Sequence, residues 1–271
     1  MCKQPKPSDI CTMLSQQKLQ EFLDEKVLRY NATDFIADDP ITIPHRFSKK
    51  QDIEIAGFFA AILAWGNRKS IIQSCNILME RMGHAPHEFC LRHSNKDLKR
   101  LLGFKHRTFN EADLLCLVQF FNRHYSHHTS LETAFAQGQQ PGDETVENAL
   151  IGFHNEVFGM PGEFEERTRK HIATPAKKSA CKRLNMYLRW MVRQDKKGVD
   201  FGLWKTIKPA QLVCPLDVHV ARVARKLGLL HRTQNDWQAA LELTHNLRQL
   251  NPIDPVQYDF ALFGLGVVEK M

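Results

Sequence analysis

Lys182 and Asp217 are the two side chains of this sequence best suited to covalent chemistry. Lys182 falls in the first turn of a helix predicted from Ser179 to about Arg193. The partial positive charge at a helix N-terminus disfavours an added cation there. This position therefore favours the neutral amine, which is the form that attacks carbon. The alternative is a lysine that contacts phosphate or is merely solvated.

Asp217 stands at the predicted N-cap of a helix over 218–227, which Gly228 ends. An N-capping carboxylate accepts backbone N–H bonds, and these favour its ionised form. A fixed anion beside a pocket can stabilise positive charge that develops on a sugar. A plain helix cap is the alternative role for this residue.

A basic segment, residues 167–197, surrounds the lysine. It holds eleven Lys and Arg residues against Asp195 alone, a charge of +10, whereas the whole chain carries +7. A segment this one-sided is typical of proteins that follow a phosphate backbone, although a solvated helix face is the alternative. The cations are Arg167, Arg169, Lys170, Lys177, Lys178, Lys182, Arg183, Arg189, Arg193, Lys196 and Lys197.

The elements that must position these residues are predicted to be helices throughout. Apolar residues recur at helical spacing, and no stretch alternates as a strand does, so we expect an all-α fold. We expect Ser48 and Gln51 to form a capping box that opens the second helix. The predicted helices cover about 16–30, 48–66, 68–82, 95–102, 111–125, 131–137, 145–158, 179–193, 218–227, 236–250 and 254–271.

The composition of the 271 residues favours a polyanionic partner such as nucleic acid. The first ten residues contain no apolar core of a secretory signal, and the longest apolar run, Ala56–Trp65, is too short to span a bilayer. Seven widely spaced cysteines without a CxxC pair indicate reduced thiols rather than disulfides, zinc or an iron–sulfur cluster. We therefore expect a cytoplasmic protein with no metal, no cofactor and no membrane partner.

The residues around Lys182 and Asp217 resemble the helix-hairpin-helix DNA glycosylase superfamily, which includes endonuclease III and 8-oxoguanine glycosylase. Residues 215–223, PLDVHVARV, are similar to that family's signature valine-aspartate-threonine-histidine-valine-x-arginine-valine. Residues 182–188, KRLNMYL, resemble its lysine-threonine-alanine-asparagine motif. The resemblance assigns the family's catalytic aspartate to Asp217 and its catalytic lysine to Lys182.

Two further stretches extend this resemblance over most of the chain. Residues 55–63 are similar to the apolar helix before the family's DNA-wedging loop, for which Trp65, Gly66, Asn67 and Arg68 stand here. Residues 258–263 resemble the late helix that lines the base pocket in 8-oxoguanine glycosylases.

The chain also departs from the family in two places. The family hairpin reads leucine-proline-glycine-x-glycine-x-lysine, whereas residues 176–182, AKKSACK, contain no glycine. Lys177 and Lys178 would replace the glycine backbone electrostatically. Moreover, 35 positions separate Lys182 from Asp217, more than in endonuclease III, so residues of about 194–210 must loop out. We read the chain as a divergent branch of the superfamily.

The resemblance implies a fold of two helical subdomains with a cleft between them. Residues 56–215 would form a helical barrel subdomain with the hairpin and Lys182, and 1–55 with 216–271 would form the other with Asp217. It also implies a monomer that acts on double-stranded DNA containing a damaged base and is associated with the nucleoid. A flipped nucleotide would enter the cleft, and Lys182 would attack its C1′ and form a Schiff base, after which β-elimination nicks the strand.

The resemblance also predicts the residues that contact DNA and the base. In the base pocket Phe263 would stack on the flipped base and Asp259 would accept hydrogen bonds from it, with an oxidised purine as first choice, although Phe263 in the core is the alternative. A non-catalytic DNA-binding protein on the same scaffold is the alternative function, since it does not need Lys182 and Asp217 to meet. The predicted DNA contacts are Trp65, Asn67, Arg68, Lys177, Lys178, Ser179, Arg183, His219 and Arg222.

Overall fold

Helices form nearly all the regular structure in the computed structural model, which describes residues 16–159 and 166–271. Within these ranges the strands are Lys105–His106 (β1) and Phe109–Asn110 (β2), which form one short antiparallel pair. The predicted all-α class is therefore confirmed. Among the same residues, no helix is both long and apolar enough to cross a membrane.

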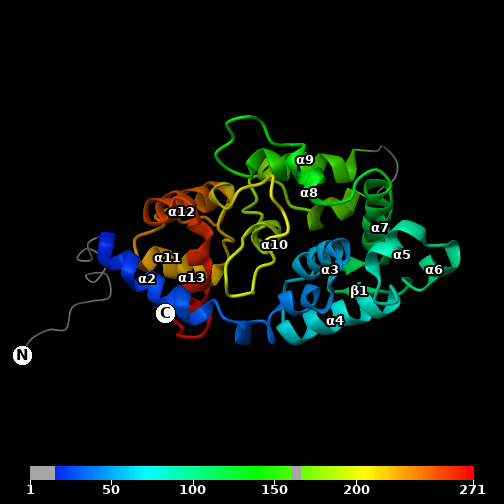
Figure 1. Ribbon diagram of the computed structural model, residues 1–271, viewed down its shortest axis with the longest axis horizontal. Helices are drawn as coiled ribbons and strands as arrows, with labels where there is room; N and C mark the ends of the chain where they lie inside the picture. Colours follow the sequence, from blue (N-terminus) through cyan, green and yellow to red (C-terminus); the bar gives the residue numbers. More distant parts are fainter. Residues whose placement is uncertain (1–15, 160–165) are drawn as a thin grey trace, which may run out of the picture.

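One group of helices unites the N-terminal helix with the last three. Helix α13 packs against α2 on one side and against α11 on the other (Figure 1). Gly264 allows the α2 contact, because a Cβ there would overlap the Tyr30 ring. The group consists of α2 (Gln16–Tyr30), α11 (Val218–Lys226), α12 (Trp237–Leu250) and α13 (Tyr258–Val267). The first and last helices of the described residues thus lie together here, while the division at residues 55 and 215 stays a prediction.

A second group of helices follows along the chain. Helix α3 contacts α4 and α5, α5 contacts α7, and α8 packs on α9. Phenylalanine rings fill the centre of the group: Phe58 of α3 meets Phe121 of α7 edge-on, with ring centroids 5.4 Å apart. The helices are α3 (Lys50–Ile62), α4 (Arg68–Arg81), α5 (Pro86–Arg92), α6 (Asn95–Lys99), α7 (Glu111–Tyr125), α8 (Glu132–Ala136) and α9 (Glu147–Phe158).

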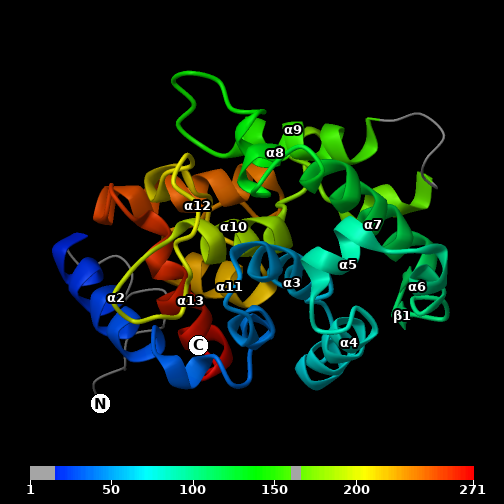
Figure 2. The ribbon, with the colours of Figure 1, turned by 45° about the vertical axis from the view of Figure 1, so that its right-hand side comes forward.

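Helix α10 (Lys182–Val192) lies between the two groups in both views of the ribbon (Figures 1 and 2). Nine of its eleven residues are buried, and Tyr187 meets Phe58 edge-on at 5.5 Å. Seven short 3-10 turns connect the described helices, of which η2 (Pro40–Thr42) and η5 (Pro175–Lys177) bear on the site. The others are η1 (Thr33–Phe35), η3 (Pro44–Arg46), η4 (Glu166–His171), η6 (Pro209–Gln211) and η7 (Pro255–Gln257).

The helix predictions differ in accuracy with the strength of their local signals. The bounds of α2 and α7 are as predicted, and Asp217 caps α11 as expected. Helix α5 was not among the predicted helices. Pro255 opens the turn η7 rather than α13 itself.

Two predicted helix caps are wrong. Helix α3 has Lys49 at its N-cap without a side-chain bond, and the Gln51 amide donates instead to the Thr129 carbonyl at 2.9 Å. Helix α10 has Cys181 at its N-cap rather than Ser179, with φ at 49°. A long-range contact for Gln51 and a left-handed residue before α10 are features that the local pattern does not contain.

The segment between α10 and η6 loops out, as the spacing of Lys182 and Asp217 required. It is tied to the second helix group by two buried acids. The Trp204 indole N–H donates to Glu54 Oε1 at 2.7 Å. The amides of Lys205 and Thr206 donate to Glu132 Oε1 at 2.7 and 2.6 Å.

Candidate active site between α10, α11 and α13

Lys182 and Asp217 meet at the point where α10 and α11 begin. Lys182 is the first residue of α10, and its Nζ lies 4.0 Å from Asp217 Oδ2. Asp217 Oδ1 accepts the amides of His219 and Val220, both at 2.9 Å. The cap therefore fixes the carboxylate while its second oxygen faces the lysine. Both side chains keep access to solvent, at 30% and 19% exposure.

A recess in front of this pair has a wide outer pocket and a narrow inner pocket. Both are lined by Lys182, Asp217, Asp39, Met186 and Phe263. The outer pocket measures about 300 Å³, which is within the range of ligand sites. The inner pocket measures about 30 Å³, room for roughly two water molecules. The outer pocket is thus large enough for a ligand, whereas the inner one admits a group larger than a few waters only if side chains move.

Asp259 and Phe263 of α13 both line the inner pocket, as predicted for a base pocket. Phe263 packs against the core and also faces the recess, where the Arg68 guanidinium lies 5.3 Å from its ring centroid. Asp259 Oδ2 is held by Arg189 Nη1 at 2.5 Å. Burial raises the pKa of Asp259 to about 6, although the Arg189 charge acts in the opposite direction. One oxygen of the predicted base acceptor is therefore already occupied.

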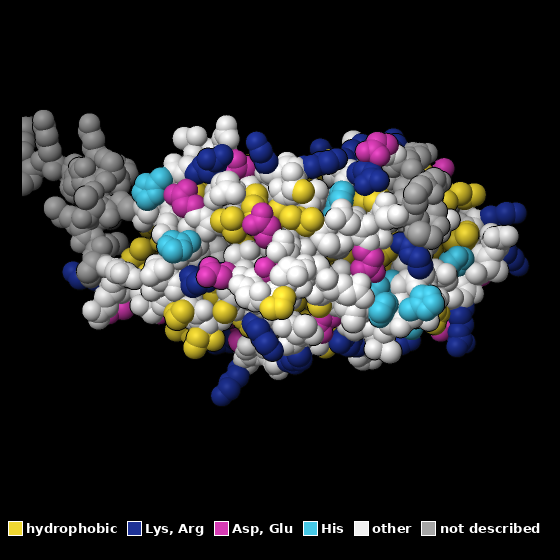
Figure 3. All heavy atoms as spheres, turned by 90° about the horizontal axis from the view of Figure 1, so that it is seen from above, with side chains coloured by type: hydrophobic (Ala, Val, Ile, Leu, Met, Phe, Trp, Pro, Cys, Tyr) yellow, Lys and Arg dark blue, Asp and Glu magenta, His cyan; other side chains and the backbone are white. Residues whose placement is uncertain are grey.

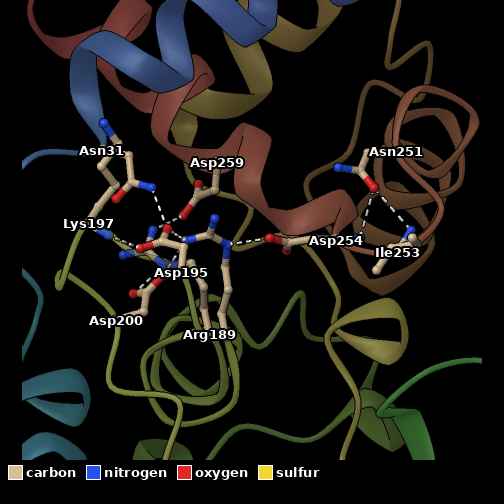
Figure 4. Close-up of polar contacts among 10 residues, drawn as sticks. Asn31, Arg189, Asp195, Lys197, Asp200, Asn251, Ile253, Asp254 and Asp259 are labelled. Atoms are coloured by element: carbon tan, nitrogen blue, oxygen red, sulfur yellow. Dashed lines mark hydrogen bonds and ion pairs between the residues drawn. The ribbon is translucent and has the colours of Figure 1, made fainter.

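A charge network is centred on Arg189, which lines the inner pocket, and on the buried Arg193. Figure 4 shows Arg189 among the aspartates of this network. Arg189 Nε lies 3.3 Å from Asp200 Oδ1, and Arg193 Nη1 lies 3.0 Å from Asp200 Oδ2. Arg193 also contacts Asp254 Oδ2 at 2.8 Å and Asp195 Oδ2 at 2.7 Å. The network ties α10 to the loop that follows it and to the start of the last helix.

The basic segment is less basic on the surface than its sequence indicates. Several of its arginines turn inward to acids from distant parts of the chain; Arg167, for example, pairs with Asp113 at 3.1 Å. On the face drawn in Figure 3, Lys and Arg side chains are scattered and lie mostly toward the edges. The exposed cations of the segment are Lys170, Lys177, Lys178, Lys196 and Lys197. Phosphate binding by the segment stays a prediction, and these five lysines are its exposed cations.

Arg183 and Arg222 donate hydrogen bonds to backbone carbonyls. Arg183 donates to the carbonyls of Ile62 at 2.5 Å and His171 at 3.3 Å, and burial lowers its pKa. Arg222, although exposed, donates to the carbonyls of Met271 and Gly266, both at 2.8 Å. Both side chains thus fix neighbouring chain segments, and their predicted DNA contacts stay predictions.

Only part of the predicted wedge reaches the recess. Arg68 lines the outer pocket with Gly66, and His219 lies there as well. Trp65 instead packs beside Arg107, whose guanidinium lies 5.0 Å from its ring centroid. Asn67 is exposed, and its side chain caps α4 by accepting the Lys69 amide at 2.9 Å.

The hairpin before α10 keeps a left-handed residue without a glycine. Lys178, at the position of the family's first glycine, has a φ of 60°. Ala180, at the second, does not have a positive φ, whereas its neighbour Cys181 does. Lys177, the last residue of the turn η5, and Lys178, which follows it, are both exposed. Ser179 pairs with Asp236 through a β-bridge, and its hydroxyl accepts the Cys181 amide at 3.2 Å.

Asp39 is a residue of the recess that the sequence analysis missed. It caps the turn η2 by accepting the Ile41 amide at 3.1 Å, and it is 8% exposed. Burial raises its pKa against the opposing charges of Arg189, Arg68 and Lys182. The Asp39–Pro40 pair is a recognisable start signal for a turn, but nothing in it indicates a pocket some 140 residues before Lys182.

The comparisons with known proteins place the chain in a family. No match was found among curated proteins or among solved structures. Residues 39–268 match the family described as "Protein of unknown function (DUF2400)". Since the match begins at Asp39 and covers most of the chain, including Lys182, Asp217 and Asp259, this chain belongs to that family.

Proposed function

We propose that this protein is a DNA glycosylase with abasic-site lyase activity, of the helix-hairpin-helix type, acting as a monomer on double-stranded DNA in the cytoplasm, with the nucleoid. One observation carries the proposal. A lysine at the start of one helix lies 4.0 Å from an aspartate that caps another, at the mouth of a pocket of about 300 Å³. Nucleophile, anion and space for a flipped nucleotide are therefore in one place.

The chemistry follows from these positions. The neutral Lys182 amine attacks C1′, and the bond from C1′ to the base breaks with its electron pair leaving on the base. Asp217 stabilises the positive charge that develops on the sugar. Loss of a proton from the resulting amine and opening of the sugar give a Schiff base on Lys182. C2′ of this intermediate then loses a proton, a double bond forms between C2′ and C3′, and the 3′ phosphate leaves with the electron pair of its bond to C3′, which nicks the strand.

The surroundings support a flipped nucleotide rather than a smaller substrate. Arg68 and His219 lie at the outer pocket, where they are placed to meet phosphates of the flipped strand. Phe263 offers a ring at the inner end for stacking on a base. An oxidised purine is our first choice for this base, and the lesion that the protein excises tests that choice.

The test is covalent trapping with borohydride, which reduces a Schiff base to a stable bond. The purified chain is incubated with duplexes that carry an oxidised purine, an alkylated purine, uracil or a preformed abasic site. We expect trapped complex on at least one lesion and on the abasic site. Lys182→Gln should abolish it, whereas Lys226→Gln, an exposed lysine at the far end of α11, should not.

The opposite result has a definite meaning. If the protein binds duplex but is trapped on none of these substrates, the proposed enzymatic activity is contradicted. That result would favour a non-catalytic DNA-binding protein on the same scaffold. Neither binding nor trapping would remove DNA as the partner.

A further inference from the structure

Asp39 has no part in the steps above, yet it lies in the recess where the base must leave. We infer that Asp39 is the acid that protonates the departing base, an inference that rests on the proposed function. It therefore also names the substrate class: a base that leaves slowly unless a ring nitrogen or carbonyl oxygen takes a proton.

The position of Asp39 fits this role. The residue belongs to neither α10 nor α11, so it reaches the recess from a third element, the turn η2. It lines the outer pocket and the inner one, so its carboxyl stands where the two join. Its Oδ1 accepts the Ile41 amide, which leaves Oδ2 as the oxygen available to a base in the recess.

The three carboxyl groups of the recess differ in what holds them. Asp217 is fixed by two amides and faces Lys182, and Asp259 is bound to the Arg189 guanidinium. These contacts hold both carboxyl groups in place, although burial raises the pKa of Asp259 as well. Asp39 makes no ion pair among the described residues, and the charged groups near it, Arg189, Arg68 and Lys182, act on it from a greater distance. Burial raises its pKa in spite of them. Of the three, Asp39 is therefore the one whose carboxyl is held by no cation of the described residues, so it can turn a proton toward a base in the recess.

The step balances without any further reactant. As the C1′–N bond breaks, its electron pair stays on the base, and the proton of the Asp39 carboxyl passes to that base. The base leaves neutral, and Asp39 is left as a carboxylate. Lys182 meanwhile forms its bond to C1′. Water returns a proton to Asp39 after the base has left.

The experiment separates base removal from the later lyase step. A preformed abasic site contains no base to protonate, so strand nicking there does not use Asp39. We compare single-turnover excision of the lesion that traps best with nicking of abasic duplex. Asp39→Asn keeps the cap of η2, because asparagine caps as well as aspartate. Loss of a general acid typically costs 10²- to 10⁴-fold, so we expect excision to fall by about 100-fold more than nicking.

The neighbouring aspartate supplies a matched control. Asp38 is exposed and one residue away, so Asp38→Asn removes the same charge from the same turn without reaching the recess. We expect its ratio of excision to nicking to match that of the unmodified protein. The pH profile adds a readout that a structural role would not move. A limb on which excision falls as pH rises through the pKa of Asp39 should disappear in Asp39→Asn.

Each remaining outcome overturns either this inference or the function beneath it. Equal losses of excision and nicking in Asp39→Asn would mean that Asp39 only supports the fold of the recess. Unchanged excision would exclude it as the acid, and so would a protein that nicks abasic sites but excises no base. If the unmodified protein is trapped on neither substrate, the proposed function itself fails.

Discussion

Each end of α10 holds a cluster of cations and aspartates, and the two clusters are arranged in opposite ways. At its start, Lys182 has one ion-pair contact among the described residues, at 4.0 Å, in a partly exposed recess. At the other end of α10, Arg189 lies in the last turn and Arg193 directly follows the helix. These two buried arginines contact four aspartates at 2.5–3.3 Å. Arginines whose guanidinium groups are fully paired with carboxylates stabilise the fold. A lysine amine with one distant ion-pair partner, next to a pocket, is free to react. The side chains suit these uses, since arginine forks bind carboxylates and a lysine amine can lose its proton.

The largest effect should come from breaking the reactive end. Lys182→Gln should reduce trapping and nicking below detection, because Lys182 is the one lysine among the described residues that line the recess. Its stability should change by no more than about 0.5 kcal/mol, since a partly exposed pair contributes little. Duplex affinity should stay nearly unchanged, because the variant removes one charge of many. Borohydride trapping measures the loss of activity, and urea unfolding of the same sample measures the change in stability. Residual trapping would show that another residue is the nucleophile.

The structural end should respond in the opposite way. Arg193→Met leaves Asp195, Asp200 and Asp254 without their common partner in the interior. Removing one side of a buried ion pair typically costs about 3–5 kcal/mol. Urea unfolding should show a decrease of that size, and Lys196→Met, an exposed neighbour, should stay within about 0.5 kcal/mol. A decrease below about 1 kcal/mol would show that the network is dispensable.

Asp217→Asn sharpens the contrast by keeping the cap and removing the charge. Asparagine caps a helix as well as aspartate does, so the unfolding free energy should hardly change. Removing one preorganised electrostatic group typically costs 10²- to 10³-fold in rate. Single-turnover excision should fall by about that factor. Asp236→Asn, the same change at the cap of α12, should leave the rate unchanged.

Asp259 belongs to both clusters, because it lines the inner pocket with Lys182 and pairs with Arg189. Its titration should therefore affect the stability of the protein. Its pKa is about 6 in the folded protein against 3.8 for an ordinary aspartate, so the folded state binds the proton more tightly. Between these two pH values the folded state holds more protons than the unfolded state, and stability therefore falls as pH rises. The stability of the unmodified protein relative to Asp259→Asn should decline from about pH 4 to about pH 6 and then level off. A rise over that range would show that Arg189 outweighs burial.

The same contrast explains which features could be predicted from the sequence. The cap at Asp217 and the turn pattern of α11 are local, so a few adjacent residues specify them. Arg189 and Arg193 are paired with Asp200, Asp254 and Asp259, which lie outside α10, and a count of charges along residues 167–197 includes these arginines in the basic segment without revealing those partners. Asp39 was missed for the same reason, because its place in the recess depends on how distant turns pack.

The smallest expected effect concerns the cations that the structure leaves on the surface. Lys177 ends the turn η5 and Lys178 follows it, and both are exposed. Arg189 of α10, by contrast, forms a buried ion pair with Asp259. If these two lysines bind phosphates, Lys177→Glu with Lys178→Glu should weaken binding to every duplex by a similar factor, because phosphate contacts carry no base information. The slope of log affinity against log salt should become shallower by about 2, roughly one for each phosphate that is no longer neutralised. Anisotropy titrations at several salt concentrations measure it. An unchanged slope would place the duplex on another face, and Arg68, the arginine that lines the outer pocket, would then be the next cation to test.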